Sequence, residues 1–134
     1  MKKLRFYVAS RFENKDEVRS IQKLLIDKGY ELSYNWCDHE GIDDHKKKEY
    51  GIADIAGVRQ SDFLVVCWPG FTGTKLEIGA ALAVRIPVYI LGCKGPDQME
   101  SDGRGTSVFW HHPLINFCGD TDELIDRIES YQII

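Results

Sequence analysis

The sequence predicts an α/β fold, a single domain in which a parallel sheet lies between two layers of helices. Apolar stretches of strand length alternate with segments of helical periodicity, as in chains built from successive strand–helix units. The stretch DFLVVCW at 62–68 is apolar almost throughout, which is typical of a strand covered on both faces. The 134 residues suffice for one hydrophobic core and show no repeat or linker, so 1–134 is expected to form one domain.

The first strand and the first helix are expected between residues 4 and 29. LRFYVAS at 4–10 is rich in β-branched and aromatic residues. Asn14 followed by Glu17 has the spacing of a capping box, which predicts that a helix begins there. Apolar residues then recur at helical spacing up to Gly29, the expected C-terminal stop.

The second strand is expected at 30–36, where polar and apolar residues alternate weakly, and a polar loop follows it. The acidic and histidine residues of the loop match no metal-ligand spacing, so no metal site is expected and the loop is expected to be solvated. These residues are Asp38, His39, Asp43, Asp44 and His45. A second helix is expected next, with one face marked by Ile52, Ile55, Ala56 and Arg59.

The second half of the chain continues the alternation. The strand at 62–68 leads into GFTGTKLEIGAALA at 70–83, which predicts a glycine-rich turn and a helix of small residues. Further strands are expected at 87–92, 107–110 and 114–118, with a long polar loop at 92–105. A last helix is expected to start at Asp120 and to pack Leu124, Ile125 and Ile128 inward.

Right-handed crossovers limit the topologies that such a chain can adopt, and they favour a flavodoxin-like three-layer αβα fold with five parallel strands in the order 2-1-3-4-5. Ligands of such sheets bind outside the carboxyl ends of the strands, where the strand order reverses. That point lies between strands 1 and 3. The crevice there is expected to be lined by Ser10, Arg11, Trp36, Asp38, Trp68, Pro69, Gly70 and Glu77.

Glu77 has two possible roles. Thr74 and Glu77 have the spacing of a capping box, in which Glu77 only secures the start of its helix. Against this, the helix follows the most apolar strand, so its start opens onto the crevice, and Gly70 and Gly73 would let a ligand approach the backbone. Asp54, on the preceding helix, is a second acid placed to come near Glu77.

Four segments resemble the nucleoside 2-deoxyribosyltransferase superfamily, which includes the 2′-deoxynucleoside 5′-monophosphate N-glycosidases. They are YVAS at 7–10, ADI at 53–55, SDFLVV at 61–66 and GTKLEIGAALA at 73–83. The resemblance covers about residues 4–92, and its most specific element is G-T-x-x-E-x-G-x-A after an apolar strand.

The resemblance implies cleavage or transfer of the N-glycosidic bond of a nucleoside or nucleotide, without a metal or an organic cofactor. It implies that Glu77 attacks the anomeric carbon to form a glycosyl-enzyme intermediate, a chemistry suited to a carboxylate. The Asp54 position assists the departing base or contacts the sugar, and Tyr7 borders the substrate. Ser10 and Arg11 would hold hydroxyl groups or phosphate. The resemblance also implies a pocket completed by a second subunit, hence a homodimer or higher homo-oligomer.

Two departures from the family pattern leave the substrate open. Phe71 stands where transferases of the family often carry an acid, and it cannot replace the serine that the monophosphate hydrolases place nearby for phosphate. Phe71, Trp36 and Trp68 are candidates for an aromatic wall against a base or a nicotinamide ring, with core packing as the alternative for each. His111 either contributes a polar group to the pocket or lies in a surface turn.

Two other functions therefore remain possible: an NAD-type nicotinamide glycohydrolase, and a non-catalytic module that binds a nucleotide derivative in the same crevice. The net charge of −4 argues against general binding to nucleic acid or to an anionic membrane surface, and no apolar run has the length of a membrane span. The four scattered cysteines are expected to be buried free thiols of a cytoplasmic protein. Residues 131–134 are a candidate contact surface between subunits.

Overall fold

The computed structural model describes residues 3–39, 44–99 and 107–133. It contains one five-stranded parallel sheet in the order β2-β1-β3-β4-β5, which confirms the predicted flavodoxin-like topology. The strands are β1 (Arg5–Ala9), β2 (Glu31–Leu32), β3 (Phe63–Cys67), β4 (Val88–Leu91) and β5 (Ile115–Cys118).

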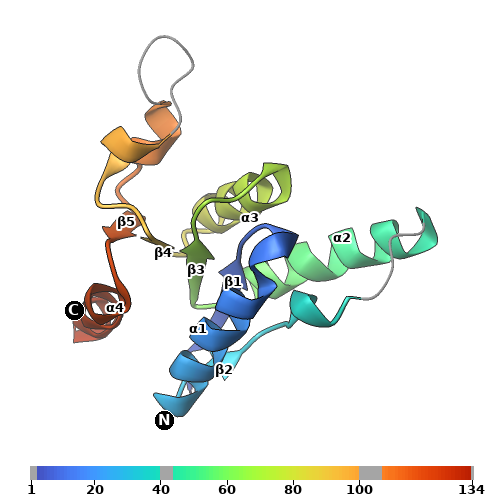
Figure 1. Ribbon diagram of the computed structural model, residues 1–134, viewed down its shortest axis with the longest axis horizontal. Helices are drawn as coiled ribbons and strands as arrows, with labels where there is room; N and C mark the ends of the chain where they lie inside the picture. Colours follow the sequence, from blue (N-terminus) through green and yellow to red (C-terminus); the bar gives the residue numbers. More distant parts are fainter. Residues whose placement is uncertain (1–2, 40–43, 100–106, 134) are drawn as a thin grey trace.

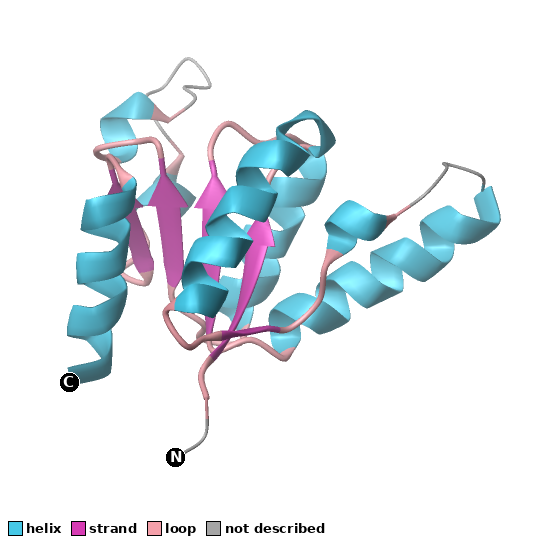
Figure 2. Cartoon of the chain, turned by 60° about the horizontal axis from the view of Figure 1, so that its bottom comes forward, coloured by secondary structure: helices cyan, strands magenta, loops and turns pink. Residues whose placement is uncertain are grey.

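Helices cover both faces of the sheet (Figures 1 and 2): α1 and α4 lie on one face, and α2 and α3 lie side by side on the other. The α-helices are α1 (Lys15–Asp27), α2 (Asp44–Arg59), α3 (Thr72–Ala83) and α4 (Thr121–Ile133). Four short 3-10 helices are η1 (Phe12–Asn14), η2 (Trp36–Asp38), η3 (Pro96–Gln98) and η4 (Val108–His111). No helix in the described ranges is long and apolar enough to cross a membrane.

The core is centred on β3, whose five side chains are all buried, as its apolar sequence predicts. Phe63 stacks on Phe6 of β1 and meets Tyr30 and Tyr89 edge to face, so aromatic contacts join three strands and the end of α1. All four cysteines are buried and free, as expected. The central strands therefore form a packed platform whose carboxyl ends can hold side chains in fixed positions.

Two expected strands and one expected loop differ from the prediction. Residues 108–111 form the 3-10 helix η4 instead of a strand, because local bonds curl the segment: Phe109 N–H donates to Ser107 Oγ, and His112 N–H donates to the Phe109 carbonyl. The second strand is confined to Glu31–Leu32. The expected loop at 92–105 is partly η3, and residues 100–106 lie outside the described residues.

The face of α2 that Ile52 and Arg59 mark does not pack on the sheet. Ile52 is 64% exposed and Arg59 is also exposed, whereas Gly57 and Val58 are buried. The reason is the glycine: a Cβ on Gly57 would lie 2.8 Å from the Tyr34 Cβ and 3.1 Å from the Tyr7 ring. Close approach at Gly57 therefore sets the rotation of α2, and it turns Asp54 rather than the isoleucines toward the sheet.

Candidate active site

Hydrogen bonds join the carboxyl ends of β1 and β3. The Ser10 hydroxyl donates to the Cys67 carbonyl over 2.7 Å, and the Asn14 amide donates to Ser10 Oγ over 2.9 Å and to the Pro69 carbonyl over 3.3 Å. Asn14 immediately precedes α1, but its side chain makes no capping bond, so the predicted capping box with Glu17 is wrong. The amide is occupied instead in joining the two sides of the crevice.

The capping box expected at Thr74 and Glu77 is also wrong. Helix α3 begins at Thr72 with Phe71 as its N-cap residue, so Thr74 lies inside the first turn and Glu77 in the second. Thr74 packs tightly against the turn before the helix, where a Cβ on Gly70 would lie 2.5 Å from the Thr74 Cβ. Thr74 is buried, and its Oγ1 has no hydrogen-bond partner within the described part of the chain. Glu77 therefore does not act as the capping residue at the start of α3.

Three elements bring Glu77, Tyr7 and Asp54 together. Glu77 comes from α3, Tyr7 from β1 and Asp54 from α2, and Glu77 is only 8% exposed. Among the described residues, Glu77 Oε2, Tyr7 OH and Asp54 Oδ1 are buried without a hydrogen-bond partner of ordinary geometry. The Tyr7 hydroxyl is still close enough to both carboxyl groups to lower their pKa by hydrogen bonding. A ligand could therefore bring partners to all three atoms.

Burial dominates the electrostatics of this group. It raises the pKa of Glu77 to about 8, and the nearby Asp54 charge adds to the effect while Tyr7 opposes it. Burial also raises the pKa of Asp54 to about 6, again opposed by Tyr7. The pKa of Tyr7 is raised by burial and then by the charges of Glu77 and Asp54. At pH 7 the two acids therefore hold about one proton between them, mainly on Glu77.

His39 extends this group, and the prediction that it lies in a solvated loop is wrong. Its Nε2 lies 3.6 Å from Asp54 Oδ1 and 2.6 Å from the Tyr34 hydroxyl, and its ring stacks on Tyr50 at 3.7 Å between centroids. The side chain is 15% exposed, and burial lowers its pKa. The only sequence signal was its position after the second strand, next to Asp38.

The other acidic and histidine residues of the expected polar loop do not extend this arrangement. His45 and Asp44 are exposed at the start of α2, and Asp43 lies outside the described residues. Within the described residues, no three His, Cys, Asp or Glu side chains are grouped so as to hold a metal ion.

Arg11 and Phe71 meet beyond the carboxyl ends of β1 and β3. The guanidinium carbon of Arg11 lies 5.4 Å from the centre of the Phe71 ring, which is 56% exposed, and the Arg11 Nε donates to Asn14 Oδ1. Gly73 has open space around the position of a Cβ. The surface beyond these strand ends thus presents a cation, an exposed ring and accessible backbone.

The remaining candidate residues are Trp36, Trp68 and His111. Trp36 is buried, and its indole N–H donates to the Val8 carbonyl, which leaves little of its surface for a ligand. Trp68 meets Trp110 of η4 edge to face, with 5.5 Å between ring centroids. His111, the last residue of η4, is exposed.

Comparisons with known proteins show a shared fold. No family model and no curated protein sequence matches the chain. The structure of a CMP N-glycosidase, BcmB, from Clostridium botulinum superposes with a TM-score of 0.61 at 16% identity, over 93% of this chain and 98% of that chain. A conserved protein from Enterococcus faecalis superposes with a TM-score of 0.65 at 20% identity, over 97% and 99% of the two chains.

Proposed function

We propose that the protein is an N-glycosidase of the nucleoside 2-deoxyribosyltransferase superfamily, acting on a nucleoside or nucleotide. The observation that carries this proposal is the set of unpartnered buried oxygens on Tyr7, Asp54 and Glu77. Unpaired buried polar atoms cost free energy, and the hydroxyl groups of a sugar would satisfy them. The shared fold with a CMP N-glycosidase supports the same class of reaction.

Glu77 is the proposed nucleophile. Its carboxylate would attack the anomeric carbon while the bond to the base breaks, and its negative charge would stabilise the oxocarbenium-like transition state. Asp54 would give its proton to the departing base. It would then take a proton from the water that hydrolyses the glycosyl ester and frees Glu77.

The proton must first move, because the pKa values of about 8 and about 6 place it on Glu77 at neutral pH. The Tyr7 hydroxyl would pass a proton to Asp54 while accepting the proton of Glu77, which leaves a carboxylate nucleophile beside a protonated acid. This transfer costs on the order of 3 kcal/mol. The positive charge that develops on the sugar offsets that cost, because it favours the ionised form of Glu77.

The test is release of free base, followed by chromatography, from a panel of nucleosides, ribo- and deoxynucleoside monophosphates (CMP among them) and NAD. The wild type should release base from at least one class, and Glu77→Gln should lower turnover on the order of 10⁴-fold. Glu129→Gln, at an exposed glutamate of α4, is the matched control and should act as wild type. Turnover by Glu77→Gln at the wild-type rate would refute the proposal. Adding a second free base to the assay separates transfer from hydrolysis.

A second candidate function is nucleotide binding without catalysis. It is favoured by the raised pKa of Glu77, because a protonated glutamate is a hydrogen-bond donor and not a nucleophile. Glutamine mimics that protonated form, so in this case Glu77→Gln would bind the ligand as tightly as wild type. Recovery of the ligand unchanged from the wild type would support binding alone, and released base would exclude it.

The proposal includes assembly of the chain into a homo-oligomer in the cytoplasm. Ile52 of α2 and Leu76 of α3 are each 64% exposed on neighbouring helices, which provides apolar surface for a second copy. Free buried thiols fit a reducing compartment. Light scattering tests the assembly, and a monomer at all concentrations would contradict it.

A further inference from the structure

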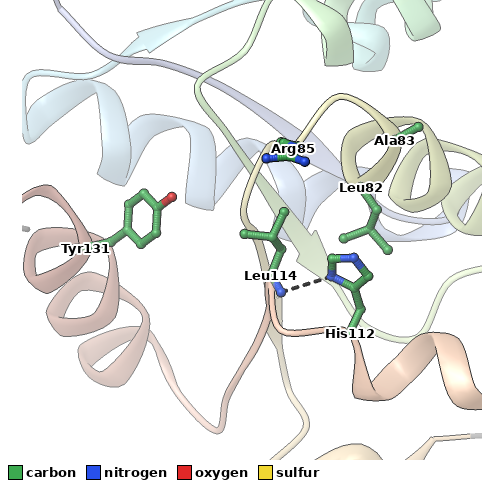
Figure 3. A pocket seen from close by; sticks show the side chains of 6 residues that line it. All are labelled: Leu82, Ala83, Arg85, His112, Leu114 and Tyr131. Carbon is green, nitrogen blue, oxygen red and sulfur yellow. Dashed lines mark hydrogen bonds between the residues drawn. The ribbon is translucent and has the colours of Figure 1, made fainter.

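A cavity lies at the opposite end of the sheet from Glu77. It has a volume of about 530 Å³ and is lined by Leu82, Ala83, Arg85, His112, Leu114 and Tyr131. Arg85 precedes β4 and Leu114 precedes β5, so the cavity lies at the amino ends of these strands. Figure 3 shows that its polar side chains come from three separate segments: the turn after α3, the turn before β5, and α4. Its volume is within the range of small-molecule sites.

Arg85 occupies a position that normally favours glycine. The end of α3 is a Schellman motif: Arg85 N–H donates to the Leu82 carbonyl over 3.1 Å, and Ile86 N–H donates to the Ala81 carbonyl over 2.9 Å. Arg85 is the left-handed residue of this motif, with φ of 63°, and the only non-glycine residue of positive φ in the described ranges. A side chain there costs free energy that glycine would avoid.

No contact among the described residues offsets that cost. Over residues 3–39, 44–99 and 107–133, the Arg85 guanidinium makes no hydrogen bond or ion pair. None of the six lining residues is acidic, although the whole chain has 21 acidic and 17 basic residues. A cation without a carboxylate partner, held in a strained turn at a cavity, is available to an anion from solution.

The other lining residues indicate which chemical groups such an anion would carry. The Leu114 N–H donates to His112 Nδ1 over 3.0 Å, so neutral His112 carries its proton on Nε2 and can donate from there. The Tyr131 hydroxyl is a further donor, and Leu82, Ala83 and Leu114 supply apolar surface.

We propose that this cavity binds a small organic anion, whose carboxylate or phosphate group pairs with Arg85 and whose apolar or aromatic body packs on Leu82 and Leu114. Arginine suits both anionic groups, because its planar fork can donate two parallel hydrogen bonds to either. The site is separate from the crevice of Glu77, so its ligand need not be a substrate.

The test is a titration of the ¹⁵N-labelled protein with phenyl phosphate, benzoate, inorganic phosphate and the neutral benzyl alcohol, followed by amide chemical shifts. Phenyl phosphate or benzoate should give saturable shifts at Arg85, His112 and Leu114, and the tighter of the two identifies the anionic group. Inorganic phosphate and benzyl alcohol should bind at least tenfold more weakly. Equal binding of either, or no saturable shift with any organic anion, would overturn the proposal.

Arg85→Gly separates binding from folding. It should abolish the shifts while its Tm stays unchanged or rises by about 3 °C, because glycine suits the left-handed position. Arg59→Ala, which removes the same charge outside the cavity, should bind as wild type. Wild-type affinity in Arg85→Gly would overturn the proposal, as would a fall in Tm, since Arg85 would then serve the fold.

Discussion

The two ends of the sheet differ in the sign and exposure of their charged side chains and in whether glycine stands where the backbone or packing favours it. At the carboxyl end, Glu77 is buried and Asp54 is half-buried, and burial raises the pKa of both carboxyl groups. Gly70 is required there because a side chain would collide with Thr74. At the amino end, Arg85 is exposed in a position where glycine would be less strained. The carboxyl end therefore suits proton transfer between groups shielded from solvent, and the amino end suits reversible capture of an anion from solvent.

The largest effect that can test this contrast is the pH dependence of stability. Folded Glu77 keeps its proton up to a pH of about 8, while an unfolded glutamate loses it near its ordinary pKa of 4.5, so unfolding releases a proton between these values. This contribution is favourable at low pH and is lost as the pH rises through 8. Relative to wild type, Glu77→Gln should gain on the order of 3 kcal/mol between pH 6 and pH 9.

Urea unfolding of both proteins at pH 6, 7.5 and 9 measures this difference. The window starts at pH 6 because Asp54, with its pKa of about 6, contributes mainly below it. If the free energy of unfolding changed with pH equally in both proteins, Glu77 would not keep a proton in the folded state. That result would contradict the difference proposed between the two ends of the sheet.

A smaller effect tests whether Gly70 is required by close packing. Gly70→Ala should lower the stability by about 2 kcal/mol, because its Cβ would lie 2.5 Å from the Thr74 Cβ. Gly73→Ala is the matched change one turn away, where nothing lies within 4 Å of the new Cβ, and it should leave stability equal or slightly higher. Thermal unfolding measures both, and equal Tm values for Gly70→Ala and wild type would contradict the close packing.

The smallest expected effect tests whether the group of Glu77, Asp54 and Tyr7 extends to His39. His39→Phe keeps a ring to stack on Tyr50 but removes the nitrogen 3.6 Å from Asp54. Without that polar neighbour the ionised form of Asp54 is less favoured, so its pKa should rise toward that of Glu77. The proton then moves from Glu77 to Asp54 at a smaller cost, so turnover near pH 8 should rise, by up to about tenfold. The acidic limb of the pH–rate profile should move to higher pH. A lower rate with an unmoved profile would mean that His39 only supports the packing of α2.

The topology was predictable because apolar runs such as 62–68 and stop signals such as Gly29 are local features of the sequence. Glu77, Asp54 and Tyr7 were predicted as site residues from their places in the strand order and from a family resemblance, and the structure places them together. Their catalytic roles stay predictions.

Other features depend on packing between distant segments and could not be predicted. Gly57 turns Asp54 inward because α2 meets Tyr34 and Tyr7 there, which no periodicity within α2 shows. His39 joins the site only because Tyr34 and Tyr50 enclose its ring. The spacing of Thr74 and Glu77 satisfied a local capping rule, but α3 starts at Thr72, and Thr74 is buried against the turn at Gly70.

The wide separation of Tyr7, Asp54 and Glu77 along the chain has a consequence for synthesis. Their three elements meet only when β1 pairs with β3 and both α2 and α3 have packed on the same face of the sheet. Such non-local contacts form late, since loops must close before they are made. In a chain emerging from the ribosome, Tyr7, Asp54 and Glu77 would therefore not be grouped until α3 has packed, so any activity that needs all three would be absent from every shorter intermediate.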